Sequence, residues 1–137
     1  ARDTLRLEAR MHLYGNDMDN TTTVLEAGLG WVTKLKQKAD FIGKQTLKDQ
    51  KAAGITRQLV GFELVDKGIA RQGYPIVDGD NQIGAVTSGT HSPTLKKSIG
   101  LGYVPVSHAE PGTTIHIKIR NKTAAATVVK GPFYKRP

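Results

Sequence analysis

The second half of the chain alternates short apolar runs with turn-forming residues. The apolar runs fall at residues 58–64, 74–77, 82–87, 98–104, 113–119 and 124–129. The turn signals between them are DGDN, PG and NK, at residues 78–81, 111–112 and 121–122. Alternation is clearest in TIHIKI at residues 114–119, which puts the isoleucines on one face. Six short strands of this kind predict a small antiparallel β-barrel or a two-sheet sandwich.

The first part of the chain contains two patterns that are typical of helices. Asp3 can cap a short helix over residues 4–9. A second helix is predicted at residues 44–53, with Leu47 on its buried face. Gly54 follows this helix, in the position where glycine commonly ends one.

Residues 25–35 are mostly apolar and interrupted by glycines, which predicts a buried strand that includes Trp31. Residues 1–54 hold too few apolar side chains for a core of their own, so we expect them to complete a domain formed by preceding residues. The predicted fold class is α+β. A mixed α/β segment at residues 1–54 precedes a small C-terminal domain at residues 55–137, which is a six-stranded antiparallel β-barrel or sandwich.

Composition excludes several classes of protein. The 137 residues are 38% hydrophobic, with 15 glycines and 6 prolines, which is an ordinary globular composition. The absence of cysteine excludes disulfides, zinc ribbons and a cysteine nucleophile. No apolar run approaches the roughly 18 residues of a membrane-spanning helix, and no secretory signal is visible. The chain does not begin with methionine, so we expect residues upstream of it.

The net charge of +8 is unevenly distributed. Residues 1–54 carry nine Lys and Arg against seven Asp and Glu, whereas residues 55–137 carry eleven against five. An excess of this size can steer an anionic partner toward the second part of the chain. The alternative is a charge that serves only solubility.

No self-contained active site is visible. The four histidines are scattered and lack the spacing of a helical metal pair, so no metal site is predicted. The acidic residues 17–20 lack the glycine and the glutamate that a calcium loop requires. The glycines of residues 28–30 do not form a dinucleotide fingerprint, and no serine lies in a nucleophile elbow.

Arg2 and Arg6 form the one cluster that suggests chemistry. A guanidinium near a helix N-terminus adds a planar, permanently charged group to the positive end of the helix dipole, which suits a carboxylate or a polarised heterocycle. The alternative is that Arg2 pairs with Asp3 or Glu8 and only fixes the helix.

Several motifs resemble one family in order and spacing. RDTLRLEA, LYGNDMD, TTTVLEAGLGWVTKL, DFIGK, and IGAVTSGTHSPTLKKSIGLGYVP are similar to the C-terminal third of the aminomethyltransferase (T-protein) family of the glycine cleavage system. The resemblance extends to the closing GPFYKRP and so covers essentially the whole chain. It implies that the upstream domain binds folate.

The resemblance also implies a reaction and its partners. An aminomethyl group on the dihydrolipoyl arm of the carrier H-protein is transferred as a methylene unit to tetrahydrofolate, and ammonia is released. Arg2 matches the folate-contacting arginine of the family, and Tyr134 and Arg136 are the nearest matches to residues around the folate tail or lipoyl entrance. A bacterial member would be cytoplasmic and a eukaryotic one would lie in the mitochondrial matrix, with no nucleic acid or membrane as partner.

Three residues depart from the family pattern. Arg10 replaces a usual glycine, and His12 and Val24 replace common prolines. The change at residue 10 would conflict with a positive φ, or would place a new cation beside the site. The essential aspartate of the family lies in its N-terminal region, so we expect no catalytic residue in this chain and no activity from this fragment alone.

Two other interpretations remain open. One is a sister enzyme, either a folate-dependent demethylase or the folate half of a sarcosine-type oxidase. The other is a basic β-barrel that binds nucleic acid or protein. Such a module would place aromatic residues among its cations, but aromatics make up only 6% of the chain and none lies in residues 113–130.

Overall fold

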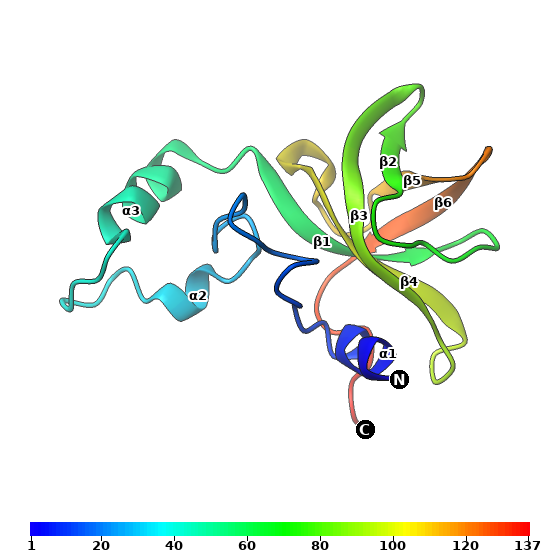
Figure 1. Cartoon of the computed structure of the whole chain (residues 1–137), viewed down its shortest axis with the longest axis horizontal. Coiled ribbons are helices and arrows are strands. Elements are labelled where there is room, and N and C mark those ends of the chain that lie inside the picture. The colour runs from blue at the N-terminus through cyan, green and yellow to red at the C-terminus, as the bar shows by residue number, and fades with distance from the viewer.

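The structure, a computed structural model, describes residues 1–137. The helices are α1 (Arg2–Glu8), α2 (Gly30–Thr33) and α3 (Lys44–Ala53). The strands are β1 (Arg57–Leu64), β2 (Pro75–Asp78), β3 (Asn81–Ser92), β4 (Lys97–Pro105), β5 (Thr114–Ile119) and β6 (Lys122–Val129), and the short 3-10 helix η1 (Val106–His108) follows β4. Figure 1 shows α2 and α3 extending away from the strands as an arm. None of the helices could cross a membrane.

The six strands close into a barrel in which all neighbours are antiparallel. Their order is β1-β4-β3-β2-β5-β6, and β1 completes the circle by pairing with β4 on one side and β6 on the other. This confirms the predicted α+β class and the six antiparallel strands. Of the two predicted architectures, the barrel is present. Closure leaves no unpaired strand edge.

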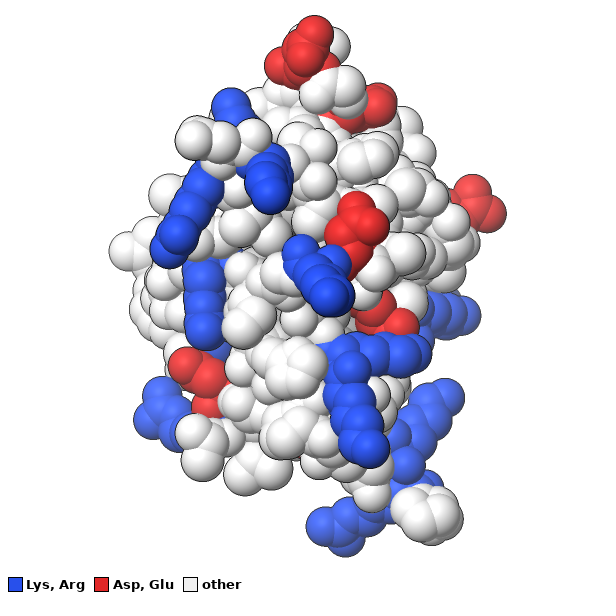
Figure 2. Space-filling view, turned by 90° about the vertical axis from the view of Figure 1, so that its right-hand side faces the viewer, with Lys and Arg blue, Asp and Glu red and all other residues white.

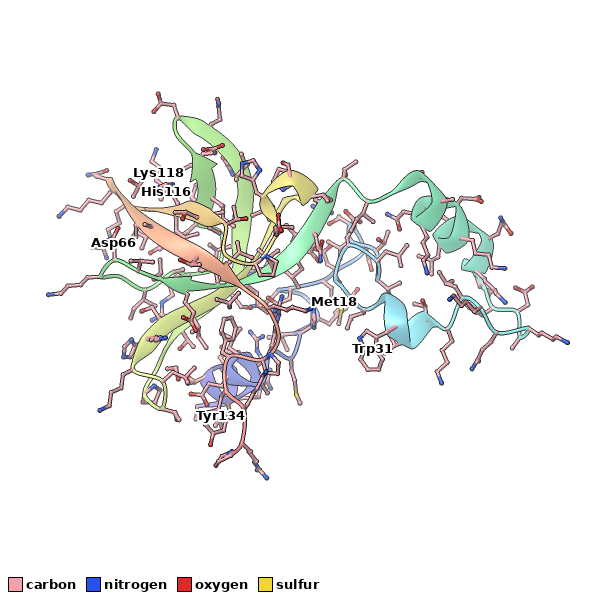
Figure 3. All side chains as sticks on the ribbon, turned by 180° about the vertical axis from the view of Figure 1, so that it is seen from behind. Met18, Trp31, Asp66, His116, Lys118 and Tyr134 are labelled. Carbon is pink, nitrogen blue, oxygen red and sulfur yellow. The ribbon has the colours of Figure 1, made fainter.

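The barrel core follows the alternation of the strands. Ile115 and Ile117 are buried, whereas His116 and Lys118 lie on the outside of β5, as predicted (Figure 3). Phe62 of β1 is completely buried in the same core cluster. Side chains on the outer face of the barrel therefore remain available for contacts with other groups.

The loop between β1 and β2, residues 65–74, lies directly on β3. A Cβ atom added to Gly89 would lie 2.0 Å from the carbonyl oxygen of Ala70, which is far inside contact distance. The hydroxyl of Ser98 on β4 donates to the carbonyl oxygen of Gly68 at 2.6 Å. The loop can therefore lie here only because residue 89 is a glycine and has no side chain.

Helix α1 attaches the N-terminal segment to the barrel. Leu7 is completely buried and packs with Leu59 of β1 and with Ile99 and Leu101 of β4. The hydroxyl groups of Thr4 and Thr90 lie 3.2 Å apart, which places α1 against β3 as well. α1 is thus part of the packed unit, although it precedes the barrel by about fifty residues of chain.

Two predictions about the helices have different outcomes. α3 covers the predicted residues 44–53 and ends before Gly54, whose φ of 86° suits glycine. The predicted cap of the first helix is wrong, because α1 begins at Arg2 and Asp3 lies inside its first turn. From there, the carboxylate of Asp3 accepts a hydrogen bond from Arg6 Nε at 3.0 Å instead.

The predicted strand at residues 25–35 is wrong. This segment makes turns and then α2, and its amide groups bond locally, as when Leu29 N–H donates to Val24 O at 2.8 Å. Gly28 adopts a φ of 75°, which turns the chain and prevents an extended conformation. Trp31, predicted to be buried, is 76% exposed.

Candidate functional site

A buried polar joint fixes the segment after α1 to the barrel. Asp17 is completely buried, and its two carboxylate oxygens accept four hydrogen bonds. Arg6 Nη1 and the amide of Leu13 donate to Oδ2, both at 2.9 Å, while the hydroxyls of Thr87 and Ser88 donate to Oδ1 at 2.6 and 2.7 Å. All polar atoms of the carboxylate are therefore satisfied, as a buried charge requires. These residues are committed to structure and not free for a ligand.

A second joint connects the loop before α2 with the first strand. Arg57 Nε donates to Glu26 Oε2 at 2.5 Å, and the guanidinium lies 4.9 Å from the centre of the Tyr103 ring. Burial alone would raise the pKa of Glu26. The hydrogen bonds from Arg57 and Thr23, together with the charge of Arg57, outweigh this and lower the pKa below its usual value.

The lowered pKa of Glu26 predicts a specific loss of stability in acid. The ionised carboxylate stabilises the fold above the ordinary pKa of 4.5, and this contribution is lost as pH falls through the lower pKa of the folded state. We expect Glu26→Gln to be less stable than the parent chain near neutral pH, and the difference to shrink below pH 4.5. Urea unfolding at a series of pH values measures this.

The matched control for this prediction is Glu110→Gln, since Glu110 is exposed and forms no ion pair. Its difference from the parent should be small at every pH. A constant deficit for Glu26→Gln from neutral pH into acid would show that packing, and not ionisation, makes Glu26 important.

The three residues predicted to contact folate lie at one end of the molecule. Arg2 is exposed at the start of α1, and it pairs with neither Asp3 nor Glu8. Tyr134 lies beside α1, where its amide donates to Glu8 O at 2.9 Å, and Arg136 follows in the exposed tail (Figure 3). Figure 1 shows both chain ends next to α1. The alternative in which Arg2 only fixes its own helix through an ion pair is therefore wrong.

A groove of about 590 Å³ runs between the N-terminal segment, β1 and the C-terminal tail. Arg10 and His12 line one wall, and Trp31 projects from α2 on another (Figure 3). The His12 Nε2 is bonded to Ala27 O at 2.8 Å, so that ring is held by the backbone. Trp31 borders the groove with an exposed ring, although the sequence predicted a buried one.

Large apolar side chains remain exposed along the N-terminal segment. They are Leu5, Met11, Tyr14, Trp31, Val32, Phe41 and Ile42. These seven residues lie on α1, on the segment after it and on the arm from α2 to the start of α3. So many exposed large apolar side chains within 42 positions favour surfaces that another part of a protein covers. We name these seven residues the apolar face.

Cations gather on the loops at the strand tips, on the side of the barrel away from α2 and α3 (Figure 1). This basic rim consists of Lys67, Lys96, Lys97, Arg120 and Lys122. It borders two grooves of about 650 and 530 Å³ that lie on either side of the β1–β2 loop. Only Lys97 has a carboxylate partner, Glu63, at 3.2 Å. Figure 2 views the barrel from this side and shows more Lys and Arg than Asp and Glu.

One other group of polar residues deserves comparison with a catalytic site. Ser107 Oγ lies 2.9 Å from His108 Nδ1, and His108 Nε2 lies 3.1 Å from Asp78 Oδ2. The three residues sit on the surface outside the grooves described above, and two of them are mostly exposed. A serine nucleophile also needs hydrogen-bond donors that stabilise an oxyanion, and a pocket that holds the substrate. We therefore interpret the Ser107–His108–Asp78 hydrogen bonds as structural. No three His, Cys, Asp or Glu side chains are grouped as metal ligands.

Two family models match separate parts of the chain. The family model described as "Glycine cleavage T-protein C-terminal barrel domain" matches residues 57–135, and the "GCVT N-terminal domain" model matches residues 1–37. The first match covers more than half of the chain. The chain belongs to the glycine cleavage T-protein family. The resemblance drawn from the sequence motifs is thereby confirmed.

Relatives of this T-protein chain are considerably longer. An aminomethyltransferase of Prochlorococcus marinus (strain MIT 9313) is 52% identical over 137 residues, which is 100% of the chain and 37% of the relative. One from Bacillus mycoides (strain KBAB4) is 53% identical over 136 residues, again 37% of the relative. The crystal structure of glycine cleavage system aminomethyltransferase T from Bartonella henselae matches with a TM-score of 0.92 and 36% identity, covering 98% of the chain and 38% of that protein. The chain thus spans little more than a third of these proteins.

Proposed function

We propose that this chain is the C-terminal part of an aminomethyltransferase of the glycine cleavage system. Its reaction transfers a methylene unit from the aminomethyl-dihydrolipoyl arm of the H-protein to tetrahydrofolate and releases ammonia. The observation that carries the proposal is the match of 98% of the chain, at a TM-score of 0.92, to an aminomethyltransferase T protein. A bacterial enzyme of this kind would act in the cytoplasm, and a eukaryotic one in the mitochondrial matrix.

The apolar face supports a role for residues 1–54 as the last segment of a folate-binding domain. Tyr14, Trp31 and Ile42 are large apolar side chains with no partner in the barrel, and Ile42 is fully exposed. Residues that precede this chain would cover much of this surface and bury its apolar area. Residues 55–137 would then form the separate C-terminal barrel domain.

The end of the molecule around α1 supports contact with tetrahydrofolate. Folate combines a flat pterin with an aromatic ring and glutamyl carboxylates. Arg2 offers a planar fork of donors that fits a carboxylate or a polar ring edge. The Tyr134 amide is bonded to Glu8 O of the same helix, and Arg136 follows two residues later in the exposed tail. This chain would bind and orient folate but would not supply the catalytic aspartate.

We assign no catalytic residue to this chain. Its buried carboxylates, Asp17, Glu8 and Glu26, are all engaged by donors within the fold, so none of them is free to handle a proton. The reactive aspartate would belong to the part of the relatives that this chain does not span. We therefore expect the chain alone to be inactive.

The basic rim supports an encounter with an acidic carrier such as the lipoylated H-protein. Four of its five cations have no carboxylate partner, so their field extends into solvent. Attraction of this type raises the association rate and weakens as salt increases. The Michaelis constant for H-protein should therefore rise with ionic strength, and a salt-independent value would exclude steering by this face.

The function is tested by tetrahydrofolate-dependent ammonia release from aminomethylated H-protein, using the full-length protein. In this assay Arg2→Ala should weaken folate binding about ten-fold or more, because a charge-assisted hydrogen bond contributes about 1.5–3 kcal/mol. Arg120→Ala is the matched control, since Arg120 is an exposed arginine on the basic rim.

Two results would count against the assignment at different levels. Unchanged folate affinity in Arg2→Ala would remove Arg2 from the site and leave the reaction standing. Absence of folate-dependent ammonia release by the unmodified full-length protein would remove the proposed function itself.

A further inference from the structure

Arg10 occupies a backbone position that favours glycine. It follows Ala9, the residue that caps the end of α1. Its amide donates to Leu7 O at 2.8 Å, and its φ is 56°. Residues that end helices in this left-handed conformation are usually glycine, since a Cβ atom is strained there. Arg10 therefore carries backbone strain that a glycine at this position would not have.

The side chain of Arg10 reaches across the end of β6. Its Nη1 donates to the carbonyl oxygens of Val129 and Gly131, both at 3.1 Å. These carbonyl groups belong to the last residue of β6 and to the tail that leaves it. Burial lowers the pKa of Arg10, which indicates that the guanidinium is removed from water as it makes these bonds.

A glycine in β1 leaves the space that the guanidinium fills. A Cβ atom added to Gly61 would lie 3.3 Å from Arg10 Cζ and 2.9 Å from Phe133 Cζ. The guanidinium and the Phe133 ring therefore both rest on the bare backbone of Gly61. This arrangement joins three separate parts of the chain: the end of α1, strand β1 and the C-terminal tail.

The tail is held at a second point by the same end of α1. The amide of Tyr134 donates to Glu8 O at 2.9 Å, and Glu8 is itself fixed by a hydrogen bond from Ser92. Residues 131–134 thus run between two fixed contacts, one on each side of Ala9. Loss of the Arg10 contacts would leave this part of the tail held by the Tyr134 hydrogen bond and by the packing of Phe133 against the cluster around Leu7.

We infer that Arg10 is a positioning residue that latches the C-terminal tail to α1 and so holds Tyr134 and Arg136 beside Arg2. The latch itself stands on the contacts of this chain. Its consequence for tetrahydrofolate rests on the proposed function. A latched tail presents its side chains in one place, which lowers the entropy lost when a ligand binds to them.

The first test measures hydrogen exchange at the Tyr134 amide in Arg10→Gly. Glycine relieves the backbone strain, so the variant is expected to fold, and any loosening comes from the missing guanidinium. We expect exchange at Tyr134 to accelerate about ten-fold or more, from the loss of two charge-assisted hydrogen bonds. Arg120→Gly is the matched control, because Arg120 has the same φ of 56° and donates no side-chain hydrogen bond. Unchanged exchange at Tyr134 in Arg10→Gly overturns the latch.

The second test separates positioning from general stability. In the full-length protein, Arg10→Gly should raise the Michaelis constant for tetrahydrofolate about ten-fold while kcat changes little, and Arg10→Lys, which keeps a cationic donor, should recover part of the loss. A loosened tail with an unchanged Michaelis constant overturns the positioning role. If the unmodified protein transfers no methylene unit, the proposed function fails, and the exchange measurement still decides on the latch.

Discussion

Replacing Asp17 with alanine is expected to destabilise the protein by about 3–5 kcal/mol, the usual cost of breaking a buried ion pair. The substitution removes an acceptor of four hydrogen bonds and leaves Arg6, which is nearly buried, without its main partner. The hydroxyls of Thr87 and Ser88 on β3 lose the same acceptor. Urea unfolding followed by circular dichroism measures the change in the free energy of unfolding.

Asp19→Ala provides the comparison, since Asp19 lies two residues away in an exposed turn. Its unfolding midpoint should stay close to that of the parent. Arg6→Ala should also destabilise, and the double variant Arg6→Ala, Asp17→Ala should lose less than the sum of the two single changes. Strict additivity would mean that the two side chains do not interact as the 2.9 Å distance implies.

Gly89→Ala is expected to cost about 3 kcal/mol of stability, at the upper end of ordinary overpacking. The added methyl group would meet the Ala70 carbonyl oxygen at 2.0 Å, and both groups are held by backbone that cannot rotate away. The β1–β2 loop must lift off β3, so the hydrogen bond between Ser98 and Gly68 should weaken with it. Thermal unfolding measures the loss, and amide exchange along residues 65–74 locates it.

Gly112→Ala separates this clash from the ordinary cost of replacing a glycine. Gly112 has a φ of 91° but nothing lies within 4 Å of an added Cβ atom, so only backbone strain of about 1 kcal/mol is expected. Equal losses for the two variants would mean that the loop moves freely and that the close approach at Gly89 carries no constraint.

The barrel was predictable because its strands carry local signals. In residues 114–119 the alternation of isoleucine with polar residues already assigns an inner and an outer face, and the structure places Ile115 and Ile117 inside. A glycine after residue 53 likewise ended α3 where the sequence predicted. These features depend on neighbours along the chain, which is the information that a single sequence holds.

The errors fall where the partners of a residue lie far away or outside the chain. Residues 25–35 have the apolar density of a buried strand, but without alternation that density does not distinguish a strand from a surface that another part of a protein covers. Trp31 was assigned to a core for that reason and is exposed here. The sequence did not predict that Asp17 would be a buried hydrogen-bond acceptor. Two of its donors, Thr87 and Ser88, lie about seventy positions later in the chain.

Arg10 lies between these two cases. The expectation that a positive φ at this position would conflict with arginine is half right, since the φ is positive and the residue nevertheless adopts it. The sequence could not show that the guanidinium finds two carbonyl acceptors more than one hundred positions away, on Val129 and Gly131. The new cation that the sequence suggested borders the groove, and its donors bond to the end of β6 and to the tail.

The closure of the barrel at β1 has a consequence for the order of folding. β5 and β6 form a local hairpin, as do β3 and β4. Hairpins of this kind form within microseconds. β1 must instead wait for both β4 and β6, where Gly61 faces Leu101 and Val129, so its pairing closes long loops. Sheets completed by distant segments fold slowly, and we expect the rate-limiting step to be the insertion of β1. Stable docking of α1, which carries Arg6 of the Asp17 joint, would follow that step, because Leu7 packs on Leu59 of β1 as well as on β4.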